Sequence, residues 1–343
     1  KVVVHDRLRR PINPWRDWLA YRKLLGELRR LAPEVVHTHS SKAGILGRAA
    51  AAAVGVPVIV HTIHGPPFHR YERPWRNRLY VAAERWAARR TDMLISVCEA
   101  MTEQFVGARV APEHMFTTIY SGLEVERFIH PCRSREVVRA ELGFGPAELV
   151  IAKAARLFEL KGHDDVLAAA ARIVPQFPQT RFLFIGDGPR RQELQLAAER
   201  LGLAEHVHFT GLVPPQRIGE LFAAADIVVH CSLREGLARA LPQALLAGRP
   251  VVSYDIDGAR EVVIPGKTGY LVQPGDIERL SGSLIELIKD AGKRLAFGTE
   301  GRRRFADQFR HQRITDQIRR LYEALLAKKR PPGCSSGAQL HRG

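Results

Sequence analysis

A glutamate and a glutamine eight residues apart follow a strand that the sequence predicts in the second half of the chain. They lie in DIVVHCSLREGLARALPQALLAGRPVVSYDID, which spans residues 226–257. Residues 227–230 have the apolar, β-branched character of a strand, Glu235 and Gly236 interrupt it, and residues 239–247 have helical spacing. At such a strand-to-helix turn, polar side chains face the ligand crevice of the sheet. Glu235 and Gln243 are about two helical turns apart, so both can bind one elongated ligand.

Two cationic residues, Arg156 and Lys161, lie at the end of another predicted strand, in the run ARLFELKGHDD. A guanidinium and an ammonium five residues apart can hold a diphosphate from two sides, because both donate charged hydrogen bonds to phosphate oxygens. Taken alone, such a pair is more typical of surface charges. Glu235 lies downstream at a suitable distance, and we therefore interpret the two cations as part of the same site.

Three glycine-containing turns follow predicted strands in the same half of the chain. Gly186 and Gly188 belong to IGDGP, Gly211 to FTG, and Gly258 to IDGARE. Backbone N–H groups at such turns can bind phosphate oxygens. Glycine is also the ordinary requirement of a tight turn, and the full dinucleotide-binding fingerprint is absent. Phosphate binding and simple turns both fit these residues.

Four histidines in the first half of the chain lie on or after two predicted strands. His37 and His39 share one strand face, and His61 and His64 belong to HTIHG at the end of the next strand. Histidine is a common metal ligand, so the group is compatible with a metal site. No carboxylate or cysteine with ligand spacing accompanies the histidines, and the two pairs lie on separate strands. We therefore predict no metal site.

The elements that must position these residues alternate between strands and helices. In the first half we expect helices at residues 15–31, 41–54 and from 99, and strands at 35–39, 57–63, 93–97 and 116–120. In the second half we expect strands at residues 150–154, 182–185, 206–209, 227–230, 250–254 and 270–272, and a helical end at 291–326. Such alternation predicts an α/β fold in which parallel sheets carry helices on both faces.

The run EGLARALPQALLAGRPVV resembles the E-x7-E signature of the family 4 retaining glycosyltransferases. These enzymes have the GT-B fold, in which two Rossmann-like domains face each other across a cleft, and the resemblance covers nearly all of residues 34–328. By this resemblance, Glu235 contacts the hydroxyls of the donor sugar. Gln243 replaces the second glutamate of the signature, which holds the ribose. An amide can still hydrogen-bond a ribose, but it accepts fewer bonds and has no charge.

Other residues match family patterns near the reacting groups. Arg156 and Lys161 match the Arg and Lys of a GRL-x(n)-KG pattern, which hold the leaving diphosphate, with Ala155 in place of the glycine. His64 matches a His-Gly pair at the floor of the cleft, close to the reacting carbon of the sugar. The resemblance thus implies that the sugar is held by Glu235 and His64 and the diphosphate by the two cations.

The glycine turns match further segments of the family. Gly186 and Gly188 belong to a GDGP turn near the nucleotide, and Gly211 lies where backbone groups recognise the base. Gly258 and Glu261 match a GG-x-x-E segment, whose first glycine is replaced by Asp257. By resemblance these turns bind the nucleotide sugar, which is a donor substrate, and no separate cofactor is expected.

The resemblance also implies the domain organisation. We expect an N-terminal, acceptor-side Rossmann-like domain at residues 1–143 and a C-terminal, nucleotide-sugar-binding domain at residues 144–305. A helix at residues 306–328 would cross back to the first domain, and residues 329–343 would form a disordered tail, because they are rich in Pro, Gly and Ser. The chain starts with an apolar run at residues 2–4, so we expect the first domain to lack its opening strands.

The chain is strongly basic, with 52 lysines and arginines against 36 aspartates and glutamates and a formal net charge of +16. Nucleic acid, an anionic membrane surface and phosphorylated substrates all fit that sign. Seven arginines crowd residues 70–90 among Tyr and Trp, as in a helix at a lipid headgroup boundary. The alternative is a solvated helix whose aromatic side chains pack inward. No recognition helix, RNA-binding signature or zinc spacing is present, so we expect no specific nucleic-acid partner.

No apolar run approaches the roughly 18 residues of a membrane span, and the four scattered cysteines form no disulfide or zinc pattern. We therefore expect a cytoplasmic protein, peripheral at the inner face of the plasma membrane.

The favoured function is that of a metal-independent hexosyltransferase. It would move a sugar, with retention, from a nucleotide-diphosphate sugar to a saccharide or polyprenyl-linked acceptor in bacterial surface polysaccharide assembly. Two alternatives remain open. One is a catalytically inactive GT-B-like module that binds a phospholigand or nucleic acid, as Gln243 and the net charge would allow. The other is a nucleotide-sugar epimerase on the same fold.

Overall fold

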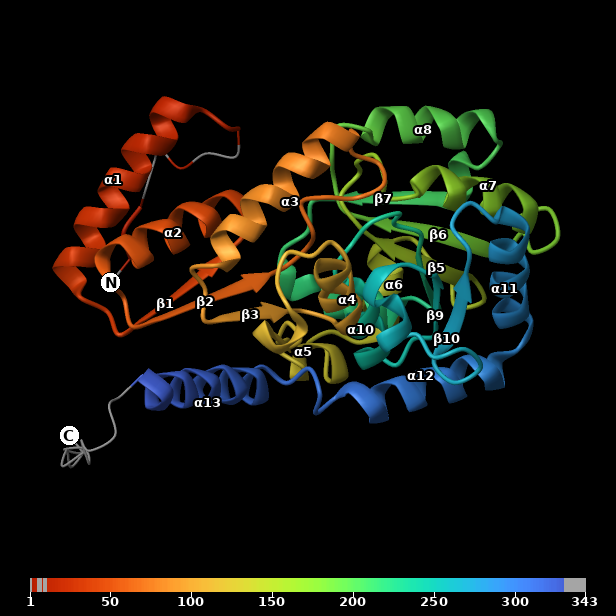
Figure 1. Ribbon diagram of the computed structural model, residues 1–343. Coiled ribbons are helices and arrows are strands. Elements are labelled where there is room, and N and C mark those ends of the chain that lie inside the picture. Colours follow the sequence, from red (N-terminus) through yellow and green to blue (C-terminus); the bar gives the residue numbers. More distant parts are fainter. Residues whose placement is uncertain (1, 5–7, 9–10, 330–343) are drawn as a thin grey trace. The chain divides into compact units, whose positions relative to one another are not determined.

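A computed structural model describes residues 2–4, 8 and 11–329 of the chain (Figure 1). These residues divide into two compact units. Unit 1 contains the described residues up to 97, residues 102–119 and residues from 315, and unit 2 contains residues 98–101 and 120–314. The expected boundary between residues 143 and 144 lies inside unit 2. The expected disordered tail lies, apart from Lys329 at the end of a helix, outside the described residues.

Unit 1 contains a four-stranded parallel sheet in the order β1-β2-β3-β4. The strands are β1 (Val35–His39), β2 (Val58–Ile63), β3 (Met93–Ser96) and β4 (Phe116–Thr118). The helices of this unit are α1 (Pro14–Leu31), α2 (Ser41–Val54), α3 (Pro74–Ala88), η1 (Glu113–Met115) and most of α4 (Glu99–Gly107) and α13 (His311–Lys329). The predicted strands of the first half are confirmed, and their ends differ from the prediction by up to two residues.

The end of the chain, far from the rest of unit 1 in sequence, also belongs to this unit. Helix α13 joins the unit from residue 315, where Tyr322 hydrogen-bonds His37 of β1 and the Lys329 ammonium lies 2.7 Å from the Asp92 carboxylate. Residues 2–4 have no regular secondary structure. The first strand of the described residues is therefore β1.

Unit 2 contains a six-stranded parallel sheet in the order β10-β9-β8-β5-β6-β7. The strands are β5 (Leu149–Ala154), β6 (Thr180–Ile185), β7 (Val207–Gly211), β8 (Ile227–His230), β9 (Val251–Tyr254) and β10 (Gly269–Val272). The helices are α5 (Glu126–Ile129), α6 (Arg135–Glu141), α7 (His163–Ile173), α8 (Arg191–Arg200), α9 (Ile218–Ala224), α10 (Ala240–Leu246), α11 (Ile277–Lys289) and α12 (Ala291–Phe305), with η2 (Ala204–His206), η3 (Pro215–Arg217) and η4 (Asp257–Glu261). All six strands predicted for this half are present.

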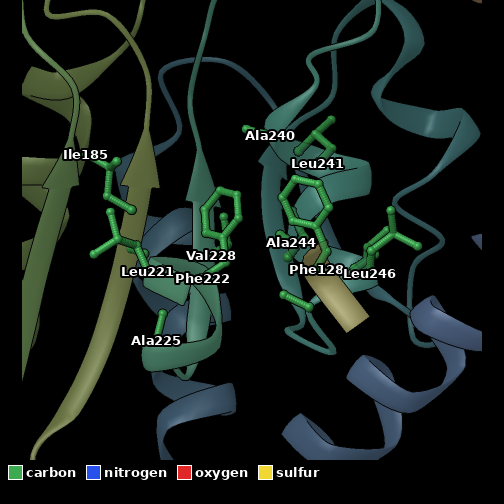
Figure 2. Close-up of a cluster of buried hydrophobic side chains, with 14 of the residues drawn as sticks. Phe128, Ile185, Leu221, Phe222, Ala225, Val228, Ala240, Leu241, Ala244 and Leu246 are labelled. Atoms are coloured by element: carbon green, nitrogen blue, oxygen red, sulfur yellow. The ribbon is translucent and has the colours of Figure 1, made fainter. Parts of the chain in front are cut away.

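The sheet of unit 2 is buried on both faces, as continuous apolar strands require. Successive residues of β8 face opposite sides: Val228 packs with Phe222 and Leu241 in one apolar cluster, whereas Val229 belongs to the cluster on the other face. Figure 2 shows the first cluster, in which side chains of α9 and α10 lie beside Val228. Helices therefore cover each face, and the loops at the strand ends are anchored to a rigid core.

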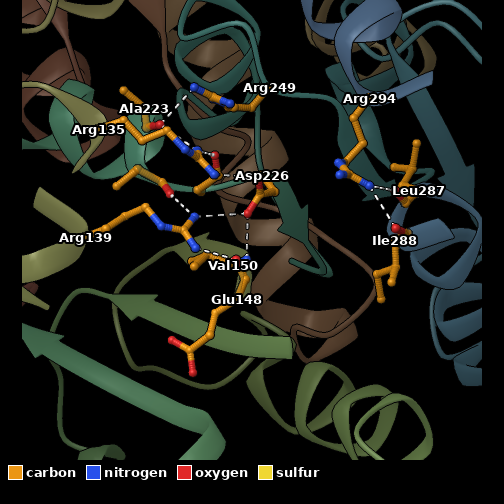
Figure 3. A network of polar contacts seen from close by, with 12 residues as sticks. Arg135, Arg139, Glu148, Val150, Ala223, Asp226, Arg249, Leu287, Ile288 and Arg294 are labelled. Carbon is orange, nitrogen blue, oxygen red and sulfur yellow. Dashed lines mark hydrogen bonds and ion pairs between the residues drawn. The ribbon is translucent and has the colours of Figure 1, made fainter. Parts of the chain in front are cut away.

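A polar network ties the segment before β5 to the sheet of unit 2 (Figure 3). The Asp226 carboxylate lies 2.6 Å from the Arg135 guanidinium and 3.3 Å from that of Arg139, and it accepts the Val150 N–H at 2.8 Å. Arg135 and Arg139 lie on α6, while Val150 and Asp226 lie at the amino ends of β5 and β8. These bonds explain why α6, which the expected boundary between residues 143 and 144 assigned to the first domain, belongs to unit 2.

Candidate active site

The strand order of unit 2 places the predicted charged residues at one edge of the sheet. The order reverses between β5 and β8, and ligands of such sheets bind beyond the carboxyl ends of the strands at that point. Arg156 and Lys161 follow β5, and Glu235 follows β8. The topology therefore brings the loops that carry all three residues together.

Lys161 and Glu235 form an ion pair across these two loops. The loops are bonded to each other, because the Leu233 N–H donates to the Leu160 carbonyl at 2.8 Å. Gly162 has a left-handed φ of 63°, and an added Cβ would lie 1.9 Å from the Cys231 carbonyl oxygen. Only glycine allows this approach, which brings Lys161 close to the end of β8.

The carboxylate of Glu235 is three-quarters buried, with 23% of its side chain exposed. Burial by itself raises its pKa, but His230, Lys161 and Ser232 together bring the pKa of Glu235 below its ordinary value. The His230 ring lies 3.7 Å from the carboxylate. Burial lowers the pKa of His230 to about 3, so the imidazole is neutral near pH 7. Lys161 is therefore the cation that keeps Glu235 ionised.

Arg156 presents an exposed guanidinium on the same loop. Its guanidinium carbon lies 4.2 Å from the centre of the Phe158 ring, so a cation–π contact holds the side chain. Among the described residues, no carboxylate forms an ion pair with Arg156, in contrast to Lys161. The positive charge of Arg156 is thus available to an anionic ligand.

The Gly186–Gly188 turn supports the loop that carries Arg156. A Cβ on Gly186 would lie 2.2 Å from the Ala155 carbonyl oxygen, and one on Gly188 would lie 2.4 Å from that of Leu157. The Leu157 N–H also donates to the Asp187 carbonyl at 2.9 Å. These contacts give both glycines a packing role, and nucleotide binding by them stays a prediction.

The turn after β9 contacts the turn that carries Glu235. The Asp257 carboxylate accepts the backbone N–H of Glu235 at 2.8 Å, and the Gly258 N–H donates to the Gly236 carbonyl at 3.1 Å. The sequence predicted that the Gly258 N–H could bind a phosphate oxygen, but in the structure this N–H donates to the Gly236 carbonyl. Asp257 was noted in the sequence only as a departure from a glycine, and no local pattern predicted its contact with Glu235.

Glu261 uses both carboxylate oxygens within unit 2. One accepts the Glu99 N–H at 3.1 Å and the Tyr120 hydroxyl at 2.8 Å, and the other accepts the Ala100 N–H at 3.1 Å. Glu261 therefore caps the start of α4, a contact that the sequence did not predict, and its predicted contact with the nucleotide is untested.

Gln243 lies on a helix, and Gly211 lies at the end of a strand, as the sequence predicted. Gln243 is half-buried on α10, and no described residue hydrogen-bonds its side-chain amide. Gly211 ends β7 with a left-handed φ of 70° and pairs with Gly186 at the end of β6. Both residues keep their predicted roles in ribose and base binding as proposals.

His64 belongs to unit 1, where it forms an exposed pair with His39. His39 Nδ1 and His64 Nε2 are 3.1 Å apart, and the two rings stack. His37 bonds Thr62 and Tyr322, while His61 is buried and lies 2.8 Å from the Thr38 hydroxyl. Burial and the Arg48 charge lower the pKa of His61 to about 2. Within the part of the chain that the structure describes, no group of three or more metal-ligating side chains is suited to a metal ion.

A buried polar cluster lies beneath the Lys161–Glu235 pair, and the sequence analysis missed it. Lys153, on β5, is 1% exposed, and His163, at the start of α7, is fully buried. Neither the Lys153 amine nor the ring nitrogens of His163 and His230 have a hydrogen-bond partner among the described residues. The detectable signal was a lysine inside the apolar run LVIAKA.

Helix α3 and the preceding turn present aromatic side chains to solvent. Trp75 is 57% exposed, Trp86 42% and Tyr71 41%, so the alternative in which the aromatic residues of this segment pack inward is wrong for these three. Arginine side chains lie over the rings, with Arg76 5.3 Å from the centre of Trp75 and Arg90 3.9 Å from that of Trp86. No helix among the described residues is long and apolar enough to cross a membrane.

Known proteins resemble the chain over most of its length. Its sequence is 27% identical over 323 residues to UDP-Gal:alpha-D-GlcNAc-diphosphoundecaprenol alpha-1,3-galactosyltransferase of Escherichia coli. The aligned residues make up 93% of this chain and 83% of the relative. It is 30% identical over 263 residues to GDP-mannose-dependent alpha-(1-6)-phosphatidylinositol monomannoside mannosyltransferase of Mycolicibacterium smegmatis, covering 74% and 66%. The crystal structure of Anabaena Alr3699/HepE in complex with UDP-glucose has a TM-score of 0.80 at 24% identity, covering 89% of this chain and 82% of that chain.

The structural likeness shows the fold, which is GT-B with two parallel-sheet α/β domains. Residues 134–304 match the family model of glycosyl transferases group 1, and residues 1–127 match that of glycosyltransferase family 4. The prediction of a glycosyltransferase is confirmed, and no finding supports the inactive alternative. The chain belongs to the family 4 glycosyltransferases.

Proposed function

We propose that the chain transfers a hexose, with retention of configuration, from a nucleoside diphosphate sugar to a saccharide or lipid-linked acceptor in cell-surface glycan synthesis. The observation that carries this proposal is the ion pair of Lys161 with Glu235 at the switch point of unit 2, beside the exposed Arg156. The printed names of relatives include a UDP-galactose transferase with a diphosphoundecaprenol acceptor and a GDP-mannose transferase, which supports a nucleotide sugar donor.

The charges of the site suit the departure of a diphosphate. As the bond between the anomeric carbon and the phosphate oxygen breaks, negative charge grows on the diphosphate, and preorganised cations lower the barrier by stabilising it. Arg156 has no carboxylate partner among the described residues, and Lys161 can turn from Glu235 toward a phosphate oxygen. The ionised Glu235 then accepts hydrogen bonds from sugar hydroxyls and orients the donor.

Two cations can fulfil the role that a divalent metal ion has in other nucleotide-sugar enzymes, and we propose that transfer needs no metal. His64 would contact the sugar near its reacting carbon, as the family resemblance implies. Gln243, Gly186, Gly188, Gly211, Gly258 and Glu261 are the proposed nucleotide-binding residues.

A thermal-shift screen of UDP-, GDP- and ADP-sugars tests the donor class, because a ligand that binds the folded state raises its melting temperature. We expect one base to stabilise the chain selectively. Glu235→Ala should then abolish transfer and leave the melting temperature of the free protein within a few degrees of wild type, since the side chain fills no apolar core. Glu199→Ala, at an exposed carboxylate on α8, is a matched control that should keep transfer. Stabilisation by none of the three donor classes would contradict the proposal.

We further propose that the enzyme acts in the cytoplasm, at the inner face of the plasma membrane. The surface formed by residues 70–90 supports this location, because exposed Trp75 and Trp86 lie beside arginines. Indole rings favour the lipid headgroup boundary, and arginines are attracted to anionic headgroups. A membrane surface would bring the enzyme close to a lipid-linked acceptor.

A further inference from the structure

We propose that Asp257 is a positioning residue for Glu235, and that it acts through the backbone of the turn that carries this glutamate. The inference rests on the proposed function of Glu235 in donor binding. The matching family segment has a glycine at this position, and we propose that the aspartate found here holds Glu235 in place.

The contact joins two loops that follow neighbouring strands of unit 2. Glu235 follows β8, and Asp257 follows β9, which pairs with β8 in parallel. The Asp257 carboxylate accepts the Glu235 N–H at 2.8 Å, and one residue on in each loop, the Gly258 N–H donates to the Gly236 carbonyl at 3.1 Å. Two adjacent hydrogen bonds therefore fix both the position and the direction of the Glu235 peptide.

The backbone of Asp257 shows why an aspartate suits this position. Its φ is 44°, in the left-handed region that most residues other than glycine avoid. Aspartate tolerates this region better than most side chains, because its short polar group bonds nearby backbone. A glycine here would adopt the same φ with less strain but would leave the Glu235 N–H without this acceptor. The aspartate thus has a more strained backbone than a glycine would have, but it provides an acceptor oxygen to the turn that carries Glu235.

The residues around Asp257 hold the turn itself in place. A Cβ on Gly258 would lie 2.8 Å from the Cβ of the buried Cys98, so Gly258 packs closely against the segment before α4. Glu261, at the other end of η4, caps the start of α4 through the Glu99 and Ala100 N–H groups. The short helix η4 is thus fixed at both ends, and Asp257 transmits that rigidity to Glu235.

Three variants of the full chain separate the hydrogen bond from the charge and from the backbone strain. Asp257→Asn keeps an acceptor oxygen and removes the charge, and Asp257→Gly keeps the left-handed φ and removes the acceptor. Asp255→Asn is the matched control, since it removes a charge from the same loop at a residue that pairs with Arg260. The readouts are amide hydrogen exchange of the peptide containing Glu235, the melting temperature, and kcat and KM with the donor selected by the thermal-shift screen.

We expect Asp257→Gly to speed exchange of the Glu235 amide about tenfold and to lower kcat about tenfold or more, with KM changed less than threefold. Its melting temperature should change little, because relief of the strained φ offsets the loss of the hydrogen bond. Asp257→Asn should stay within about threefold of wild type in both exchange and kcat, and the control should match wild type.

Equal amide exchange or equal kcat in the glycine and asparagine variants would overturn the proposal, whether both variants match wild type or both fall below it. If the wild type binds no nucleotide sugar, the proposed function fails, whereas the exchange comparison still decides whether Asp257 holds the Glu235 turn.

Discussion

The buried amine of Lys153 makes the stability of unit 2 dependent on pH, and its replacement by methionine measures that dependence. Lys153 is 1% exposed, and its amine has no hydrogen-bond partner among the described residues. Desolvation lowers the pKa of Lys153 below its ordinary value of 10.5, with Lys161 acting in the same direction and Cys231 and Glu235 opposing it. Methionine has a similar length and no polar group, so it fills the same space without this cost.

The magnitude follows from the proton that folding removes. Between the lowered pKa and 10.5, the unfolded chain binds this proton and the folded chain does not, so the stability of the wild type rises with pH by about 1.4 kcal/mol per unit. Below pH 10.5, and down to the lowered pKa, this proton loss costs the folded state more free energy as the pH falls. The unpartnered neutral amine adds about 1–3 kcal/mol. Lys153→Met should therefore be more stable than wild type at pH 9 by at least the cost of the unpartnered amine, about 1–3 kcal/mol, and its advantage should be larger at pH 8 than at pH 9.

Urea unfolding followed by far-ultraviolet circular dichroism at pH 8 and pH 9 tests this expectation. Tryptophan fluorescence is unsuitable, because all four tryptophans lie in unit 1, whereas Lys153 lies in unit 2. Lys267→Met, at an exposed lysine of unit 2, is the matched control and should show no change in the pH dependence. A variant that is no more stable than wild type, or one whose stability runs parallel to that of wild type with pH, would show that the folded protein holds the Lys153 amine charged and paired.

Three further expectations concern the proposed function. Arg156→Ala and Lys161→Ala should each weaken nucleoside diphosphate binding by about 1.5–3 kcal/mol, and the double variant should lose less than the sum if both cations hold the same oxygens; unchanged calorimetric affinity in both single variants would remove the pair from the site. Transfer should persist in EDTA, and loss of activity that Mn²⁺ or Mg²⁺ restores would contradict a mechanism based on the two cations. The chain should float with vesicles that contain phosphatidylglycerol, less so as salt rises and less after replacement of Arg73, Arg76 and Arg78 by Ser; equal recovery from neutral and anionic vesicles would leave α3 as an ordinary solvated helix.

The strands and the charged residues of the candidate site could be predicted from the sequence, because both depend on local patterns. Runs of three to five mostly apolar residues predicted every strand of unit 2, and Arg156, Lys161 and Glu235 each follow such a run. The strand order brings the two loops together, since β5 and β8 are neighbours at the switch point, and the close approach of Gly162 to Cys231 places Lys161 beside Glu235. The prediction of a glycosyltransferase needed the family resemblance in addition.

The division of the chain into units could not be predicted in the same way. Residues up to 143 were expected in the first domain, yet residues 120–143, with α6, belong to unit 2. Its attachment depends on Arg135 and Arg139, which bond a carboxylate about 90 residues downstream at Asp226. Contacts of this kind leave no periodic signal in the sequence. The same holds for Asp257, whose partner is a backbone N–H that no side-chain pattern reveals.

The loops at the switch point carry several features that oppose stability. Leu160 and Asp257 have left-handed φ values of 60° and 44°, and strain of this kind costs on the order of 1–3 kcal/mol per residue. The amine of the buried Lys153 has no hydrogen-bond partner in the part of the chain that the structure describes. Such features persist only where the surrounding structure holds them, and here the apolar clusters on both sheet faces and the close backbone contacts of Gly162 do so. Leu160 directly precedes Lys161, and Asp257 accepts the Glu235 N–H, so this strain lies next to both functional residues. The core of unit 2 therefore holds the backbone of both turns in place, and a fixed backbone presents the Lys161 cation to the leaving diphosphate after rotation of its side chain alone.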